Sequence, residues 1–237
     1  MDNNHISSLF DKDLNKLNNN LLSLGNTALD QFDKCINNFG TQDIDKIEKV
    51  INSDKILDDL DDKVQKLGFE IIALRAPQAA DLRRIIVALK VATIFERIGD
   101  YSRNISNRTK LLIELNYSDL PGVNIGKMGQ KTQTMFEDVL EAYMNEDDKL
   151  AVKVRNSDFK VDKLHTEYYL EIISSMQRNK NFAPTGAHLL FIAKNIERVA
   201  DYVTDIAEQV YFLVNGSVLS DHRPKADETS LKVPDWL

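Results

Sequence analysis

The sequence predicts an all-α protein made of two tandem, pseudo-repeated three-helix bundles. Nine glycines and five prolines in 237 residues are too few to separate the many short strands of an all-β fold. Apolar residues recur every three or four positions along most of the chain, which is the spacing of a buried helix face. In addition, one stretch of sequence recurs about 101 residues further on. A repeat of this length indicates that one structural unit occurs twice.

The first unit is expected to span residues 1–115 and to contain three long helices. Gly40 ends the first helix, because glycine readily adopts the left-handed conformation that follows many helices. Pro77 ends the second, because the residue before a proline is disfavoured in the α conformation. The apolar spacing predicts these helices at about 14–39, 41–74 and 77–115.

A linker and a second unit are expected to follow. Residues 116–129 hold one proline and three glycines, which indicates a break between helices. The second unit is predicted at 130–216, where Asn215-Gly216 ends the last helix. Polar residues and two prolines predict a flexible C-terminal tail over 217–237. The helices of this half are expected at about 127–144, 147–177 and 185–214.

The repeat is visible residue by residue. Val91–Tyr101 aligns with Ile192–Tyr202 at an offset of 101, and both segments contain Glu-Arg-x-x-Asp-Tyr. One helix earlier, Asp54–Leu60 aligns with Asp158–Leu164 at an offset of 104. The two halves therefore look like copies of one three-helix unit.

Pairs of acidic residues four positions apart are the strongest candidate site. Residues i and i+4 share one helix face, and like charges there repel by a few tenths of a kcal/mol unless something compensates them. A cation is the natural compensator, and oxygen-rich clusters favour Mg²⁺, Ca²⁺, Mn²⁺ or iron. If the helices of each bundle pack antiparallel, each half would gather four carboxylates. The candidates are Asp54, Asp58, Glu96 and Asp100 in the first half, and Asp158, Asp162, Glu197 and Asp201 in the second.

Other interpretations of these residues stay open. The acidic pairs could form an ordinary solvated face. Arg97 and Arg198, next to the glutamates, could instead supply the compensating charge or bond within the bundle. Asp162 and His165 have a spacing that could hold a metal, although the first repeat has Asp61 at the position of His165.

Composition excludes several other functions. The net charge is −7 and no basic stripe is present, so nucleic acid is not an expected partner. The lone Cys35 cannot form a disulfide within the chain, which favours a reducing, cytoplasmic location. No apolar run is long enough for a membrane span, and the first residues do not resemble a secretory signal. No nucleophile motif or Glu-x-x-His occurs, so we expect no catalytic residues and no enzyme.

The paired motifs resemble those of the PhoU family of bacterial phosphate-transport regulators. Phe95–Asp100 followed by Asn104-Ile105 is similar to the family's Leu-Glu-Arg-Ile-Gly-Asp signature and the Asn-Ile after it. Pro77–Arg83 is similar to its Pro-x-Ala-x-Asp-Leu-Arg stretch, and Arg223–Asp227 to the Arg-Pro-Lys-Gly-Asp ending of many members. The resemblance covers about residues 10–230.

This resemblance implies a cytoplasmic, homodimeric regulator that holds phosphate-starvation signalling down when phosphate is plentiful. The implied partners are the ATPase subunit of a phosphate ABC transporter and a phosphate-sensing histidine kinase, so that the protein reaches the membrane only through its partners. The resemblance also implies multinuclear iron or zinc on the eight carboxylates named above. Two alternatives remain: a carboxylate-bridged dimetal enzyme, and an accessory of a different phosphate permease.

Overall fold

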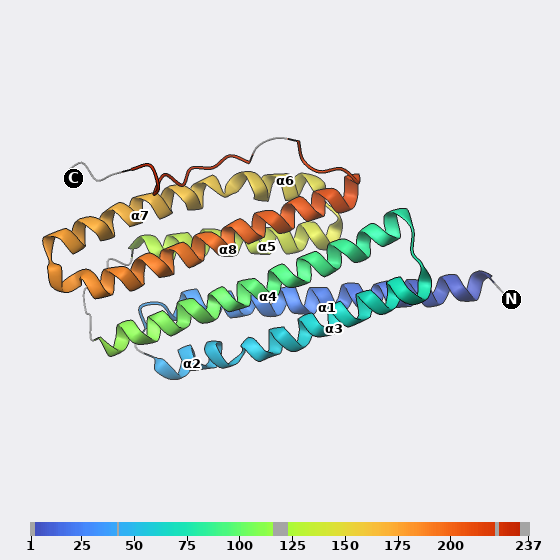
Figure 1. Ribbon diagram of the computed structural model, residues 1–237, viewed down its shortest axis with the longest axis horizontal. Helices are drawn as coiled ribbons and strands as arrows, with labels where there is room; N and C mark the ends of the chain where they lie inside the picture. The colour runs from blue at the N-terminus through green and yellow to red at the C-terminus, as the bar shows by residue number, and fades with distance from the viewer. Residues whose placement is uncertain (1–2, 42, 116–122, 221–222, 233–237) are drawn as a thin grey trace.

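The computed structural model confirms the all-α fold and describes residues 3–41, 43–115, 123–220 and 223–232 (Figure 1). The described residues contain no strand. The helices follow one another in the order α1 (Asn3–Asn38), α2 (Ile44–Asn52), α3 (Asp54–Arg75), α4 (Ala79–Glu114), α5 (Val123–Asn145), α6 (Asp148–Ser157), α7 (Phe159–Arg178), the short 3₁₀ helix η1 (Lys180–Phe182) and α8 (Ala183–Asn215).

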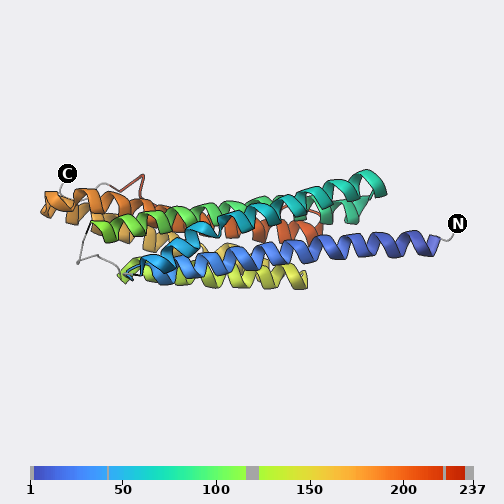
Figure 2. The ribbon, with the colours of Figure 1, turned by 90° about the horizontal axis from the view of Figure 1, so that it is seen from below.

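The two repeats lie side by side and form one elongated molecule (Figures 1 and 2). Helices α1 to α4 make up the first repeat and α5 to α8 the second. The last helix of each repeat lies at the centre, where α4 packs against α8, and α1 packs against α5 on the other side of the same interface. The chain therefore places its two Glu-Arg-x-x-Asp-Tyr helices next to each other.

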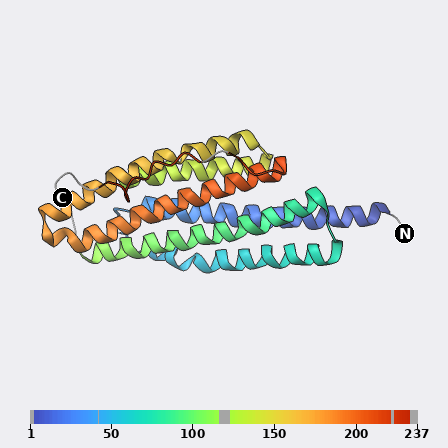
Figure 3. The same ribbon diagram turned by 45° about the horizontal axis from the view of Figure 1, so that its top comes forward.

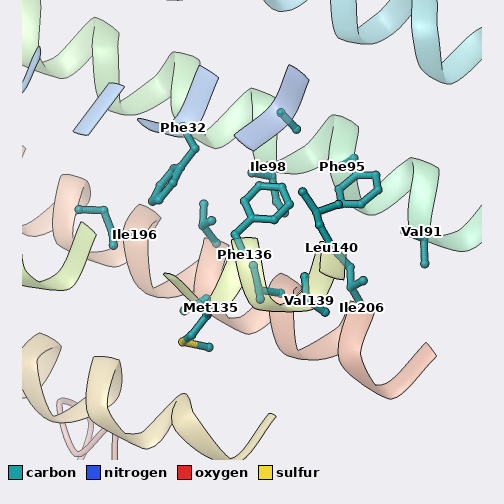
Figure 4. Close-up of a cluster of buried hydrophobic side chains, with 14 of the residues drawn as sticks. Phe32, Val91, Phe95, Ile98, Met135, Phe136, Val139, Leu140, Ile196 and Ile206 are labelled. Atoms are coloured by element: carbon teal, nitrogen blue, oxygen red, sulfur yellow. The ribbon is translucent and has the colours of Figure 1, made fainter. Parts of the chain in front are cut away.

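One hydrophobic core is shared by both repeats. Figure 4 shows Phe32 of α1 and Phe95 of α4 among side chains of α5 and α8, including Phe136 and Ile196. The rings of Phe95 and Phe136 stack with their centroids 5.7 Å apart, which joins the last helix of one repeat to the first helix of the other. The two halves are thus packed as a single body.

Two of the predicted long helices are broken at equivalent positions. The helix expected at 41–74 is divided at Ser53 into α2 and α3, and the helix expected at 147–177 is divided at Asp158 into α6 and α7. Just before each break a serine hydroxyl donates to the carbonyl three residues earlier, Ser53 to Val50 at 2.7 Å and Ser157 to Val154 at 2.8 Å. Such bonds compete with the helix ladder and bend it. Each break leaves a candidate ligand, Asp54 or Asp158, at the start of the following helix.

The predicted linker and tail also need correction. Helix α5 begins at Val123, so residues 123–129 of the predicted 116–129 linker are helical, and the rest lies outside the described residues. The tail was predicted to be flexible, but residues 223–232 pack on the second repeat, where they contact acids of α7 and α8. Turn residues alone could not reveal this, because the docking depends on charges that lie far away in the sequence.

At one contact between helices, the two repeats differ in the size of both residues, and this difference leads to a testable prediction. A Cβ added at Gly99 would lie 2.1 Å from Leu57 Cδ1, whereas the equivalent positions of the second repeat hold Ala200 and the smaller Val161. We expect Gly99→Ala to lower the free energy of unfolding by about 1–3 kcal/mol through overpacking. Adding Leu57→Val should restore part of this loss, because it removes the clashing methyl group. Urea unfolding of both variants measures the effect, and strictly additive losses would contradict it.

Candidate functional site

The first carboxylate cluster lies between α3 and α4. Asp54 begins α3, while Asp100 and Glu96 lie one turn apart on α4. The guanidinium of Arg103 bridges the two helices: its Nη1 donates to Asp54, and its Nη2 donates to Asp100 Oδ1 at 2.6 Å. The fourth predicted ligand, Asp58, is exposed on the next turn of α3. The helices thus bring Asp54 and Asp100 together around one guanidinium, and a metal site built from all four acids stays a prediction.

The acids of the first cluster influence each other's charge. Burial raises the pKa of Asp54, against the opposing effect of Arg103. Burial also raises the pKa of Glu96, and the charges of Asp100, Asp58 and other nearby acids raise it further. Glu96 therefore sits in a negative field that a single guanidinium does not fully offset.

The second cluster is far more deeply buried. Asp158, Asp162 and Glu197 are all at most 3% exposed, and Asp201 is partly exposed. Burial raises the pKa of Asp158 to about 7 against the opposing charge of Arg223, and burial also raises the pKa of Glu197. Buried carboxylates need compensating partners, because removing their charge from water is costly.

The partners come from the C-terminal strap, which we define as residues 223–232. Arg223 Nη2 lies 3.0 Å from Asp158 Oδ2 and also bonds to Asp201. Three residues further on, the Ala226 backbone N–H donates to Asp162 Oδ2 at 2.8 Å. The strap therefore contacts three of the four acids directly. Figure 3 shows the tail running back along the second repeat.

The fourth acid is reached through a lysine. Lys194 Nζ lies 2.6 Å from Glu197 Oε2 and 3.3 Å from Asp227 Oδ2 of the strap. Asp227 also lies 3.4 Å from Nδ1 of the buried His165, whose pKa is lowered by burial. His165 thus serves as a contact for the strap in this structure.

Within the described residues, the arginines of the repeated motif form no ion pair with the carboxylates. Arg97 Nη1 donates to the Tyr202 hydroxyl at 3.3 Å, and its guanidinium lies 5.8 Å from the centre of that ring. Tyr202 in turn contacts Tyr101 across the interface between the repeats, with ring centroids 5.8 Å apart. Arg198 is exposed. The counter-charges are Arg103 and Arg223 instead.

The donor set fits a hard cation, although the clusters are not preassembled for one. Among the residues that the structure describes, no three Asp, Glu, His or Cys side chains converge closely enough to hold a metal ion. In each cluster a guanidinium lies between the acids. The carboxylate oxygens are suitable ligands for iron, Mn²⁺ or Mg²⁺. Moreover, the buried Asp158 Oδ1 has no hydrogen-bond partner within the described part of the chain.

Sequence reasoning missed two features of the site. Arg103 follows Asp100 by three residues, a spacing that signals a helical ion pair, but the equivalent position in the second repeat is Thr204 and so the repeat did not reveal it. The helix breaks were also detectable, since the same tripeptide, Asn-Ser-Asp, lies at both breaks, at residues 52–54 and 156–158. No sequence pattern of this kind indicates that Lys194 pairs with both Glu197 and Asp227.

The fold and the site define a class of protein: an all-α, tandemly repeated molecule with an arginine-bridged carboxylate cluster in each repeat. A model of the PhoU domain matches residues 21–109 and again residues 125–210, one match for each repeat. The chain belongs to the PhoU family. No helix among the described residues has the length and apolar character needed to cross a membrane.

Relatives and solved structures agree with this assignment. The "Phosphate-specific transport system accessory protein PhoU homolog" of Caulobacter vibrioides is 37% identical over 75% of this chain and 77% of its own length. A protein of the same name from Clostridium acetobutylicum is 31% identical over 69% of this chain and 74% of its own. The crystal structure of PhoU from Pseudomonas aeruginosa has a TM-score of 0.85 at 26% identity, covering 88% of this chain and all of that one.

Proposed function

We propose that this protein is a non-catalytic accessory of a phosphate-specific transport system. It would link the transporter's ATPase subunit to a phosphate-sensing histidine kinase and hold the starvation response down when phosphate is plentiful. The observation that carries the proposal is membership of the PhoU family over both repeats, together with the printed names of its relatives. We place its action in the cytoplasm, as a homodimer that reaches the membrane through these partners.

The long helices provide extended surfaces for such docking. Several large apolar side chains remain exposed on them, including Phe69 and Leu74 at the far end of α3 and Phe191 on α8.

We further propose that the two carboxylate clusters bind metal ions, with iron or zinc as the family resemblance implies. The first set of ligands is Asp54, Asp58, Glu96 and Asp100, and the second is Asp158, Asp162, Glu197 and Asp201. A bound cation would supply positive charge between acids that repel each other. The acidic residues connect α3 with α4 and α7 with α8, and they thereby fix the shape of the surfaces presented to partners.

The regulatory role predicts a clear genetic result. Deleting the gene in its host should switch on a phosphate-starvation reporter in phosphate-rich medium, because the brake on signalling is lost. Restoring the gene should switch the reporter off again. Reporter output that stays unchanged after deletion would contradict the proposed function, whatever the metal content of the protein.

A further inference from the structure

The same two acids are bridged by an arginine in each repeat, but the arginine comes from a different place. In the first repeat Arg103 lies on α4, beside the acids it joins. The equivalent position in the second repeat is Thr204, which has no charge to offer. There the guanidinium of Arg223 arrives from the tail and bonds both to Thr204 and to Asp201. The second repeat thus receives from the tail the guanidinium that the first repeat carries on its own helix.

The strap is held at several points along its length. Beyond Arg223, whose side chain is only 12% exposed, the backbone N–H of Ala226 donates to Asp162. The backbone N–H of Glu228 donates to Thr166 Oγ1 at 3.1 Å, and Asp227 pairs with Lys194 at 3.3 Å. These bonds place a positive charge and a donor on carboxylate oxygens that a metal ion would need.

We propose that the C-terminal strap is a built-in competitor for the second carboxylate cluster. This inference rests on the cation role assigned above. While Arg223 is docked, a divalent cation is kept out of the second cluster, because both need the oxygens of Asp158 and Asp201 and their positive charges repel. Binding of a cation there releases residues 223–232. The ligand and the strap therefore favour two different states of one segment.

Among the described residues, no segment from elsewhere in the chain competes for the first cluster in this way. The side chain of Arg103 is 36% exposed, so a change of rotamer can move it into solvent without displacing any other segment. The two clusters are therefore expected to load unequally: the first at low cation concentration, and the second only when the strap undocks. This asymmetry would make the position of the tail report how much cation is bound.

The competition sets the size of the expected effect. When only a fraction of molecules is competent to bind, the apparent Kd rises by the inverse of that fraction. If the strap is undocked in about one molecule in ten, removing its anchor should tighten binding at the second cluster about tenfold.

The test uses the full-length chain and Mn²⁺ as the probe. Calorimetric titrations are made in a background of Asp54→Asn with Asp100→Asn, which silences the first cluster. Into this background Arg223→Ala removes the anchor. Lys232→Ala is the matched control, because Lys232 pairs only with Glu228 within the strap in the described contacts. We expect Arg223→Ala to lower the Kd for Mn²⁺ about tenfold, and Lys232→Ala to leave it unchanged.

A second readout follows the strap itself. Trypsin cleaves after Lys225 but not after Arg223, which precedes a proline. In the wild-type protein, saturating Mn²⁺ should accelerate cleavage after Lys225, and Arg223→Ala should give fast cleavage without the metal. Circular dichroism confirms that each variant is folded.

Two results would overturn the competition in distinguishable ways. Equal Kd values for Arg223→Ala and its background, with cleavage unaffected by Mn²⁺, would show that strap and cation do not compete while leaving the cation role intact. No binding of Mn²⁺ by any variant, including wild type with its first cluster intact, would remove the cation role and the competition with it.

Discussion

Replacing Phe136 with alanine is expected to lower the free energy of unfolding by about 3–5 kcal/mol. This side chain is fully buried and stacks on Phe95, so its loss opens a cavity at the point where the two repeats meet. Because one core serves both halves, the loss should shift a single unfolding transition rather than divide it. Urea unfolding followed by circular dichroism measures both the size and the cooperativity of the effect.

An exposed phenylalanine provides the control for this experiment. Phe69 lies on α3 with 60% of its surface exposed, and Phe69→Ala should change stability by less than about 0.5 kcal/mol. A Phe136→Ala variant that unfolds in two separate steps, with the second repeat melting first, would show that the halves are independent bundles and would contradict the shared core.

Changing the central acids to amides is expected to abolish metal binding. A variant with Asp54→Asn, Asp100→Asn, Asp158→Asn and Asp201→Asn keeps the size of each changed side chain and removes two of the four carboxylate charges in each cluster. Neutral amides are much weaker ligands for hard cations than carboxylates are. We expect iron or zinc measured by mass spectrometry to fall to background in the purified variant.

The fold of this variant is expected to survive, since the mutual repulsion of each acidic group is lost together with its pairing to arginine. The matched control is Glu137→Gln with Glu141→Gln, an exposed pair with the same spacing on α5. Its metal content should equal that of the wild type. Equal metal content in the four-site variant would mean that metal binds elsewhere or only adventitiously.

Much of the fold was predictable because it depends on local patterns. Helical periodicity and the repeat identified the helices and the number of units, and few turn residues are needed to connect long helices. The breaks at Ser53 and Asp158 were missed because apolar spacing continues through them, while the cause is a serine hydroxyl bonding to its own helix. The start of α5 at Val123 was missed because Gly126 and Gly129 lie inside its first turns, and glycine has a low intrinsic preference for helix.

Only the residues of the site that occur in both repeats could be predicted from the sequence. The i, i+4 acids were picked out because each copy of the repeat supports the other, and their role as metal ligands stays a prediction. The counter-charges were not found, because the two repeats obtain them differently: Arg103 from the same helix, and Arg223 from a segment 22 residues after Asp201. Sequence spacing does not reveal which distant basic residue will form an ion pair with a buried acid.

The metal-binding role proposed for the two arginine-bridged clusters has a direct structural test. Anomalous diffraction from crystals grown with iron or zinc, collected at the metal's absorption edge, tests it most directly. We predict a peak among the carboxylates of Asp54 and Asp100, and a peak beside Asp158 only where Arg223 has moved away. Peaks confined to other surfaces of the protein, with both arginine bridges in place, would contradict the account.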